Sequence, residues 1–195
     1  MKKLLIVLLT SMASALSAMA QNTDFRGYEW GSSLEKIQES ESVPYVAKVS
    51  NDELIYRDQL GGYDCDVHYI FNDNDKLEGG VYLFTKKYPN PQFYVEDYNT
   101  FKSLLTQKYG KAVAENVNWK NNTTTSTDKQ AYGQAVADGN LTLNTRWNTP
   151  RSSVMIILFT TPEKQPVLQI YYTARSLEEL QNKATLKTAI KAISI

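Results

Sequence analysis

The sequence predicts an α+β fold, with antiparallel strands in one or more sheets and helices packed on one side. Over 63–71, apolar residues at every second position alternate with Asp64, Asp66 and His68, and helical patterns precede groups of short strands. The connections between those strands are too short for the crossovers that a parallel sheet needs. We therefore expect a single domain over residues 21–195, within which 25–90 and 93–175 are candidate half-repeats with the same helix-then-strands order.

Residues 1–20 have the features of a signal peptide. Two lysines precede a continuous apolar run over 4–9, and small residues precede the expected cleavage site between Ala20 and Gln21. The apolar run is too short for an anchor helix, and no cysteine lies near the cut to carry a lipid. We expect the mature protein in the periplasm or outside a bacterial cell, without a membrane span or a lipid anchor.

The composition excludes several classes of protein. The hydrophobic fraction is 42% and the charged fraction 22%, as in folded soluble domains. Loss of Lys2 and Lys3 leaves 19 basic against 21 acidic residues without a basic run, which disfavours nucleic acid and anionic membranes as partners. One cysteine and one histidine exclude an intramolecular disulfide and any site that needs two histidines. We expect no cofactor.

In the first half of the chain, a capped helix is expected to precede four strands. Ser32 and Glu35 match a capping box, which predicts a helix over 32–41 that ends before Pro44. Residues 72–76 have the composition of a turn, so the strands on either side of it should form a hairpin. The predicted strands are 43–49, 54–57, 63–71 and 77–85.

In the second half, a longer helix should run from near Val95 to Tyr109. Gly110 follows it, where a left-handed residue commonly ends a helix. Its predicted apolar stripe comprises Tyr98, Phe101, Leu104, Leu105 and Tyr109. Residues 121–128 are polar and of low complexity, as in a loop. The remaining predicted elements are strands over 113–119, 140–148, 152–160 and 166–174, a short helix over 129–137 and a final helix over 176–193.

The mature chain carries F-R-G-x-x-W-G-x-S-x-E-x-I over 25–37 and L-T-Q-K-Y-G-K over 105–111. In these motifs it resembles a broad set of exported bacterial α+β proteins of unknown function. It is also distantly similar to the small lipoproteins of the outer-membrane β-barrel assembly machinery, although it lacks their lipid-bearing cysteine. The resemblance implies an exported protein and supplies no catalytic residue.

Three motifs could carry chemistry, and each has a simpler interpretation. Residues 33–36 and 126–129 match S-x-x-K, the pairing of penicillin-recognising enzymes, but the partner motifs are absent and helix capping explains the first match. Asp64, Asp66 and His68 share one strand face, where a solvated polar face is favoured over a metal site. Residues 72–75 lack the glycine and glutamate of a calcium loop. We therefore assign no catalytic and no metal-binding residue.

Two single residues have predicted structural roles. Trp30 precedes the turn into the first helix and is expected to anchor that helix to the sheet. Cys65 lies on the apolar side of the 63–71 alternation and is expected to be buried, reduced and inert. The 13 tyrosines, 6 phenylalanines and 3 tryptophans favour packing of half-buried strands, with stacking on a ligand as the alternative.

The hypothesis drawn from the sequence is an exported, non-enzymatic envelope protein that binds another protein. A small-ligand or glycan-binding module that uses Tyr and Trp is the first alternative. A hydrolase with an acid pair is the second, for which Glu29 with Glu35 and Glu178 with Glu179 are examples of nearby carboxylates. The binding residues, the partner and the oligomeric state are not predicted.

Overall fold

The computed structural model describes residues 23–50, 52–120 and 128–175. The predicted signal peptide, its cleavage site between Ala20 and Gln21, and the predicted helix over 176–193 lie outside these residues. The helices are α1 (Leu34–Ser40), α2 (Gln92–Tyr109) and α3 (Tyr132–Ala137), with a 3-10 turn η1 (Lys129–Ala131) before α3. The strands are β1 (Tyr45–Ser50), β2 (Glu53–Leu60), β3 (Tyr63–Phe71), β4 (Leu77–Phe84), β5 (Ala114–Trp119), β6 (Leu141–Asn148), β7 (Ser152–Thr160) and β8 (Pro166–Ala174).

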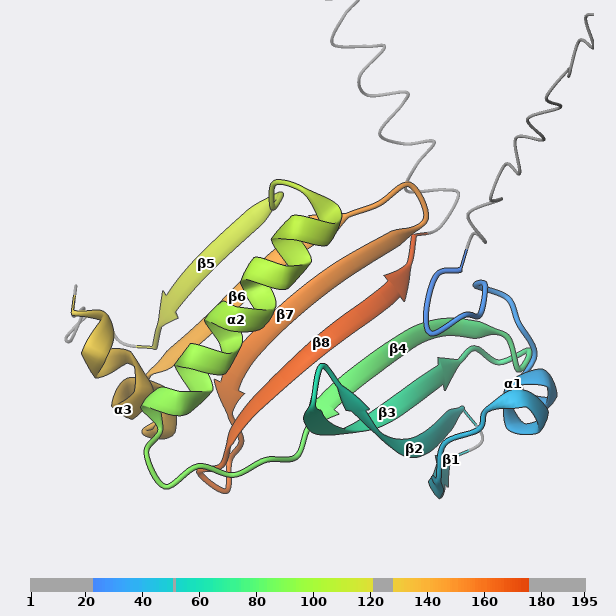
Figure 1. The fold of residues 1–195 in the computed structure, drawn as a ribbon, viewed down its shortest axis with the longest axis horizontal. Coiled ribbons are helices and arrows are strands. Elements are labelled where there is room, and N and C mark those ends of the chain that lie inside the picture. The colour runs from blue at the N-terminus through green and yellow to red at the C-terminus, as the bar shows by residue number, and fades with distance from the viewer. Residues whose placement is uncertain (1–22, 51, 121–127, 176–195) are drawn as a thin grey trace, which may run out of the picture.

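The described strands form one eight-stranded antiparallel sheet, so the prediction of an α+β fold with antiparallel pairing is confirmed. The strand order is β1-β2-β3-β4-β8-β7-β6-β5. Strands β1 to β4 pair in chain order, as do β5 to β8, and the two groups meet where β4 pairs with β8 (Figure 1). The last described strand therefore lies in the middle of the sheet.

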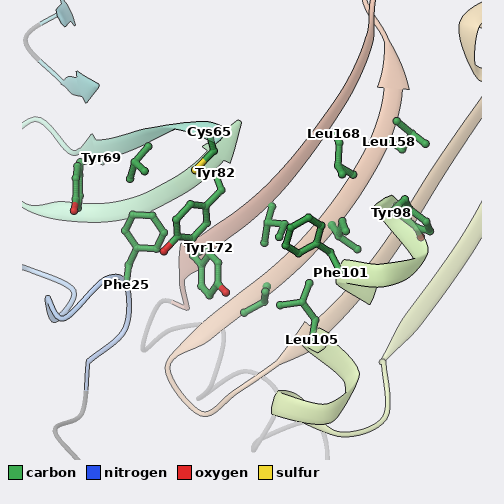
Figure 2. Close-up of a cluster of buried hydrophobic side chains, with 14 of the residues drawn as sticks. Phe25, Cys65, Tyr69, Tyr82, Tyr98, Phe101, Leu105, Leu158, Leu168 and Tyr172 are labelled. Carbon is green, nitrogen blue, oxygen red and sulfur yellow. The ribbon is translucent and has the colours of Figure 1, made fainter. Parts of the chain in front are cut away.

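One face of the sheet carries the hydrophobic core. In β3 the side chains of Cys65, Val67 and Tyr69 are buried, whereas the residues between them are not. Helix α2 lies across this face over β6, β7 and β8, and α3 contacts β6 and β7 beside it (Figure 1). Figure 2 shows how the buried side chains of α2 point toward those of β7 and β8; the labelled residues include Tyr98, Phe101, Leu105, Leu158 and Leu168.

The opening motif packs on the same face, over the first half of the sheet. The Phe25 ring lies against Tyr69, Tyr82 and Tyr172 at centroid distances of 5.2 to 5.5 Å. Arg26 forms an ion pair with Asp58 at 2.7 Å and donates from Nε to the Tyr69 hydroxyl at 3.0 Å. These contacts hold the segment that precedes α1 against β2, β3 and β4.

The start of α1 differs from the prediction. Ser33, not Ser32, is the N-cap, and its Oγ accepts a hydrogen bond from the backbone N–H of Lys36 at 3.3 Å. Two adjacent serines offered the same chemistry, and Gly31, at φ +87°, sets the turn that brings Ser33 into the capping position. The first S-x-x-K match is therefore a helix cap, because its lysine takes part through the backbone.

Helix α2 also differs in two details. It begins at Gln92, three residues before Val95, with Pro91 as the N-cap. The side chain of Leu104 is 50% exposed, so its inclusion in the apolar stripe was wrong. The buried side chains of α2 are Tyr94, Val95, Tyr98, Phe101 and Leu105, and Tyr109 is half-buried. With 3.6 residues per turn, Leu104 falls outside the face that these residues define.

Candidate binding face

The sheet face opposite α2, called here the open face, carries the three polar residues that the sequence placed together on β3. Asp64, Asp66 and His68 alternate with the buried Cys65, Val67 and Tyr69, which confirms that they share a face away from the core. Each of the three has its own partner, from β2. Gln59 Nε2 donates to Asp64 at 2.7 Å, Arg57 Nε donates to Asp66 at 2.9 Å, and Glu53 lies 2.6 Å from His68 Nδ1.

These contacts pair side chains of β2 with side chains of β3 and do not direct three of them toward a common point. The hydrogen bond to Asp66 and its negative charge raise the pKa of Arg57. Within the described ranges, no three His, Cys, Asp or Glu side chains lie close enough together to hold a metal ion. The other ring nitrogen of His68, Nε2, is buried and has no hydrogen-bond partner among the described groups.

The strand register sets out what lies beside this polar cluster. Across the open face, one row runs Ile55, His68, Val81, Tyr171, Met155, Arg146. The next row runs Arg57, Asp66, Leu83, Gln169, Ile157, Asn144, Asn116. Apart from Ile55 on β2, both rows are polar or charged toward the outer strands. Their other large apolar side chains lie on β4, β8 and β7.

The centre of the open face is an apolar stripe. We use this name for the half-buried side chains of Leu83, Met155, Ile157, Phe159, Val167 and Tyr171. Val81 lies among them and is buried. The Tyr171 hydroxyl donates to Gln169 Oε1 on the same face, and burial raises the pKa of Tyr171. On the far flank, Asn116 Nδ2 donates to Asn144 Oδ1 at 2.9 Å.

Strand β7 carries the signal by which sequence reasoning could have found this stripe. Residues 154–159 read V-M-I-I-L-F, an apolar run without alternation. Such a run is typical of a strand that is covered on both faces. Val154, Ile156 and Leu158 face the core under α2 and are fully buried. Met155, Ile157 and Phe159 face the open side and stay half-buried.

A second feature is a hollow of about 650 Å³ beside the N-terminal end of α2. Its lining includes Tyr63, Tyr88, Phe93 and Asp97, and the Phe93 side chain is 43% exposed. The Tyr88 hydroxyl donates to Asp97 Oδ2 at 2.5 Å, and Lys86 Nζ lies 4.8 Å from the centre of the Tyr88 ring. Because Lys86 occupies one face of that ring, Phe93 presents the most accessible aromatic surface here.

The tryptophans occupy structural positions. Trp147 is buried, and its Nε1 donates to the Gly110 carbonyl at 3.1 Å. Trp30 is half-buried at the edge of the core, where its Nε1 donates to Ser152 Oγ at 3.0 Å. Trp119 is half-buried and meets Tyr132 edge-on.

Comparison of the chain with protein families, with characterised proteins and with solved structures finds no match. The resemblance of the opening motif to exported bacterial proteins therefore stays a prediction. In the part of the chain that the structure describes, none of the helices combines the length and the apolar character needed to cross a membrane.

Proposed function

We propose that the protein is a non-enzymatic binding protein that engages another protein through the apolar stripe of the open face. The observation that carries this proposal is β7, whose residues 154–159 are apolar on both sides while α2 covers one side. Apolar side chains gathered on one surface favour association, because burying them removes apolar area from water. The partner would bury the open side of β7. Both faces of the strand would then be covered, as its apolar composition indicates.

The dimensions of the face fit a protein partner. Eight strands about 4.8 Å apart, with lengths up to nine residues, give a face of roughly 38 by 30 Å. That area exceeds the about 800 Å² that each partner buries in a standard protein interface. The stripe spans three strands, or roughly 14 Å, which accommodates one α-helix about 10 Å across. We therefore propose that the partner presents an amphipathic helix.

The flanks of the stripe support the same kind of partner. On the β2–β3 side, Arg57, Asp66, His68 and Glu53 form a margin of charged and polar groups. On the β5–β6 side, Asn116 and Asn144 form a neutral amide margin. A helix with an apolar stripe and polar sides would meet matching chemistry on both margins.

The architecture that leaves this face open is part of the proposal. We propose that all helices of the domain pack on one side and that a helix followed by four strands is a duplicated unit. The order α1-β1-β2-β3-β4 and the later order α2-β5-β6-β7-β8 support the duplication, with η1 and α3 inserted after β5. The meeting of β4 with β8 supports it further, because each is the last strand of its unit.

Export to the periplasm or the exterior, after cleavage between Ala20 and Gln21, belongs to the same proposal. The basic start, the apolar run and the small residues before the cut support it. A non-enzymatic role is supported by the ion pairs of three partly buried carboxylates: Glu41 and Asp58 pair with Arg26, and Asp24 pairs with Arg151. The glycan-binding module and the acid-pair hydrolase remain alternatives, and the hollow beside Phe93 is where a sugar would be sought.

Site-directed photo-crosslinking in the producing bacterium tests the proposal. A benzoylphenylalanine at position 171 places the reactive group in the stripe, and the same residue at position 104 places it on the opposite side, on exposed Leu104. We expect position 171 to form an adduct with an amphipathic helical segment of another protein, and Ile157→Asp to abolish that adduct. A synthetic peptide of the crosslinked segment should bind the purified protein and bind the Ile157→Asp variant at least about tenfold more weakly.

Two results would contradict the proposal. An adduct between position 171 and residues 176–195 of the same chain would mean that the chain covers its own stripe. Equal adducts from positions 171 and 104 would mean that the stripe has no preference for a partner. A circular dichroism melt of Ile157→Asp checks that the variant is folded, as a half-buried position on the open face should allow.

A further inference from the structure

The two edge strands of the sheet differ in regularity. Strand β1 pairs with β2 through a register that shifts twice, between Tyr45 and Ala47 and between Lys48 and Ser50. Strand β5 pairs with β6 without a shift, from Ala114 opposite Arg146 to Trp119 opposite Leu141. Bulges bend an edge away from further pairing, and a regular edge presents its free N–H and C=O groups in line. The outer edge of β5 is therefore the better template for another strand.

Among the described residues, β5 carries few of the other features that protect edges. It contains no proline, and its one charged residue, Glu115, accepts a hydrogen bond from Lys102 Nζ at 2.7 Å. Val117 is 45% exposed, and Val113, just before the strand, is 54% exposed. Beside the strand, a hollow of about 470 Å³ separates it from α2, with Val95, Tyr98 and Leu143 among its lining residues. An added strand would bring its side chains to the rim of this hollow.

We propose that β5 pairs antiparallel with β5 of a second copy of this chain, which joins the two sheets edge to edge. A two-fold axis perpendicular to the sheet relates two antiparallel edge strands and keeps each face continuous. Residues on the same face then lie opposite one another, so the residue on the axis faces itself. We place Val117 on that axis.

The side chains that oppose one another favour this register over the one with Asn116 on the axis. With Val117 opposite Val117 of the second copy, Glu115 faces Trp119, Ala114 faces Lys120, and Asn116 faces Asn118. No charge faces a like charge, and two β-branched apolar side chains meet at the centre. The asparagine pairs extend the Asn116–Asn144 hydrogen bond across the junction on the open face. The neighbouring register, with Asn116 on the axis, sets the Glu115 carboxylate against Val117 and is less favourable.

Sedimentation equilibrium of the purified mature chain tests the pairing. A six-residue edge buries less than a standard interface, so we expect a monomer–dimer equilibrium in the micromolar range. Val117→Lys places two like charges on the axis and should shift the sample to monomer. The matched control is Val46→Lys at the other edge, where Val46 is 42% exposed and the dimer should persist. A wild-type chain that stays monomeric to about 1 mM, or equal weakening by both variants, overturns the proposal.

Crosslinking through cysteine tests the register and does not depend on how Val117→Lys folds. Val117→Cys should form a disulfide-linked dimer on oxidation with copper phenanthroline, because position 117 faces itself. Glu115→Cys should not, because the two positions 115 lie roughly 13 Å apart along the strands in this register. Native Cys65 is buried and supplies the background control. A crosslink at position 115, or from an Asn116→Cys variant in preference to Val117→Cys, overturns the register; no crosslink at any β5 position overturns the interface.

Discussion

The ring of Phe25 lies directly on the backbone of Gly80. A Cβ atom at position 80 would stand 2.3 Å from Cε1 of that ring, which is far inside contact distance. Because Gly80 has no side chain, the Phe25 ring can pack there and contact the aromatic cluster of Tyr69, Tyr82 and Tyr172. The phenylalanine of the F-R-G motif and a strand glycine 55 residues away are one structural unit.

Gly80→Ala should lower the free energy of unfolding by about 1–3 kcal/mol, because the new methyl group displaces the Phe25 ring. Urea unfolding measures the change. Gly79→Ala is the matched control, since a Cβ there meets the Ile70 side chain at 3.3 Å and should cost less. In a Phe25→Ala background, the loss caused by Gly80→Ala should shrink; an equal loss in both backgrounds would argue against the contact.

The Glu41 carboxylate should make stability depend on pH in the acid range. Burial alone would raise the pKa of Glu41, but the hydrogen bond from Tyr69 and the charge of Arg26 outweigh it, so the pKa lies below its usual value. The unfolded chain then binds more protons, so this contribution is complete above the unfolded pKa of about 4.3 and is lost as the pH falls toward the folded pKa. Glu41→Gln should cost about 2 kcal/mol at pH 7 and progressively less below pH 4.

Urea unfolding at pH 7, 5, 4 and 3 measures this dependence. Glu39→Gln is the control, because Glu39 is exposed on α1, two residues before Glu41. A cost for Glu41→Gln that stays constant over this range would show that the Glu41 carboxylate is not held by Tyr69 and Arg26.

Cys65 should react slowly with thiol reagents in the native protein. Burial, and then the nearby Asp58 carboxylate, raise the pKa of the thiol to about 11, so the reactive thiolate is scarce at neutral pH. We expect labelling by Ellman's reagent at least about 100-fold slower than for a Ser103→Cys variant, whose position on α2 is exposed. Full labelling should follow unfolding in guanidinium chloride. Native labelling as fast as in the variant would place Cys65 at the surface.

Trp30 should contribute to the stability of the fold through the packing of its ring and through its hydrogen bond to Ser152. Trp30→Ala should cost about 3 kcal/mol, at the lower end for a large aromatic residue because the side chain is half-buried. Trp30→Phe keeps most of the ring and loses the bond to Ser152 Oγ, so it should cost about 1 kcal/mol. Chemical denaturation compares the two variants. A Trp30→Ala protein as stable as the wild type would assign the ring to binding instead of packing.

Local patterns in the sequence predicted the elements well, because alternation and caps depend on near neighbours. The alternation around Cys65 placed the polar side chains of Asp64, Asp66 and His68 correctly on one face. Ser33 replaced Ser32 as the cap because both residues have the same chemistry and only the φ of Gly31 separates them. The apolar stripe of the open face could not be predicted in the same way, because alternation within a strand does not show which strand lies beside it. Leu83, Gln169 and Ile157 form one row only because β4 pairs with β8.

The central place of β8 has a consequence for the order in which the chain can fold. Hairpin pairing joins β1 to β4, and likewise β6 to β8, through contacts close in sequence, and β5 pairs with β6 across the inserted η1 and α3. Tyr82 and Ile170 of the β4–β8 pair, in contrast, stand 88 residues apart. Closing so long a loop costs more entropy than closing a hairpin, so this pairing is the slow, non-local step. Until β8 has been synthesised, β4 and β7 each have an unpaired edge. A nascent chain therefore keeps its two halves apart until its last described strand joins them.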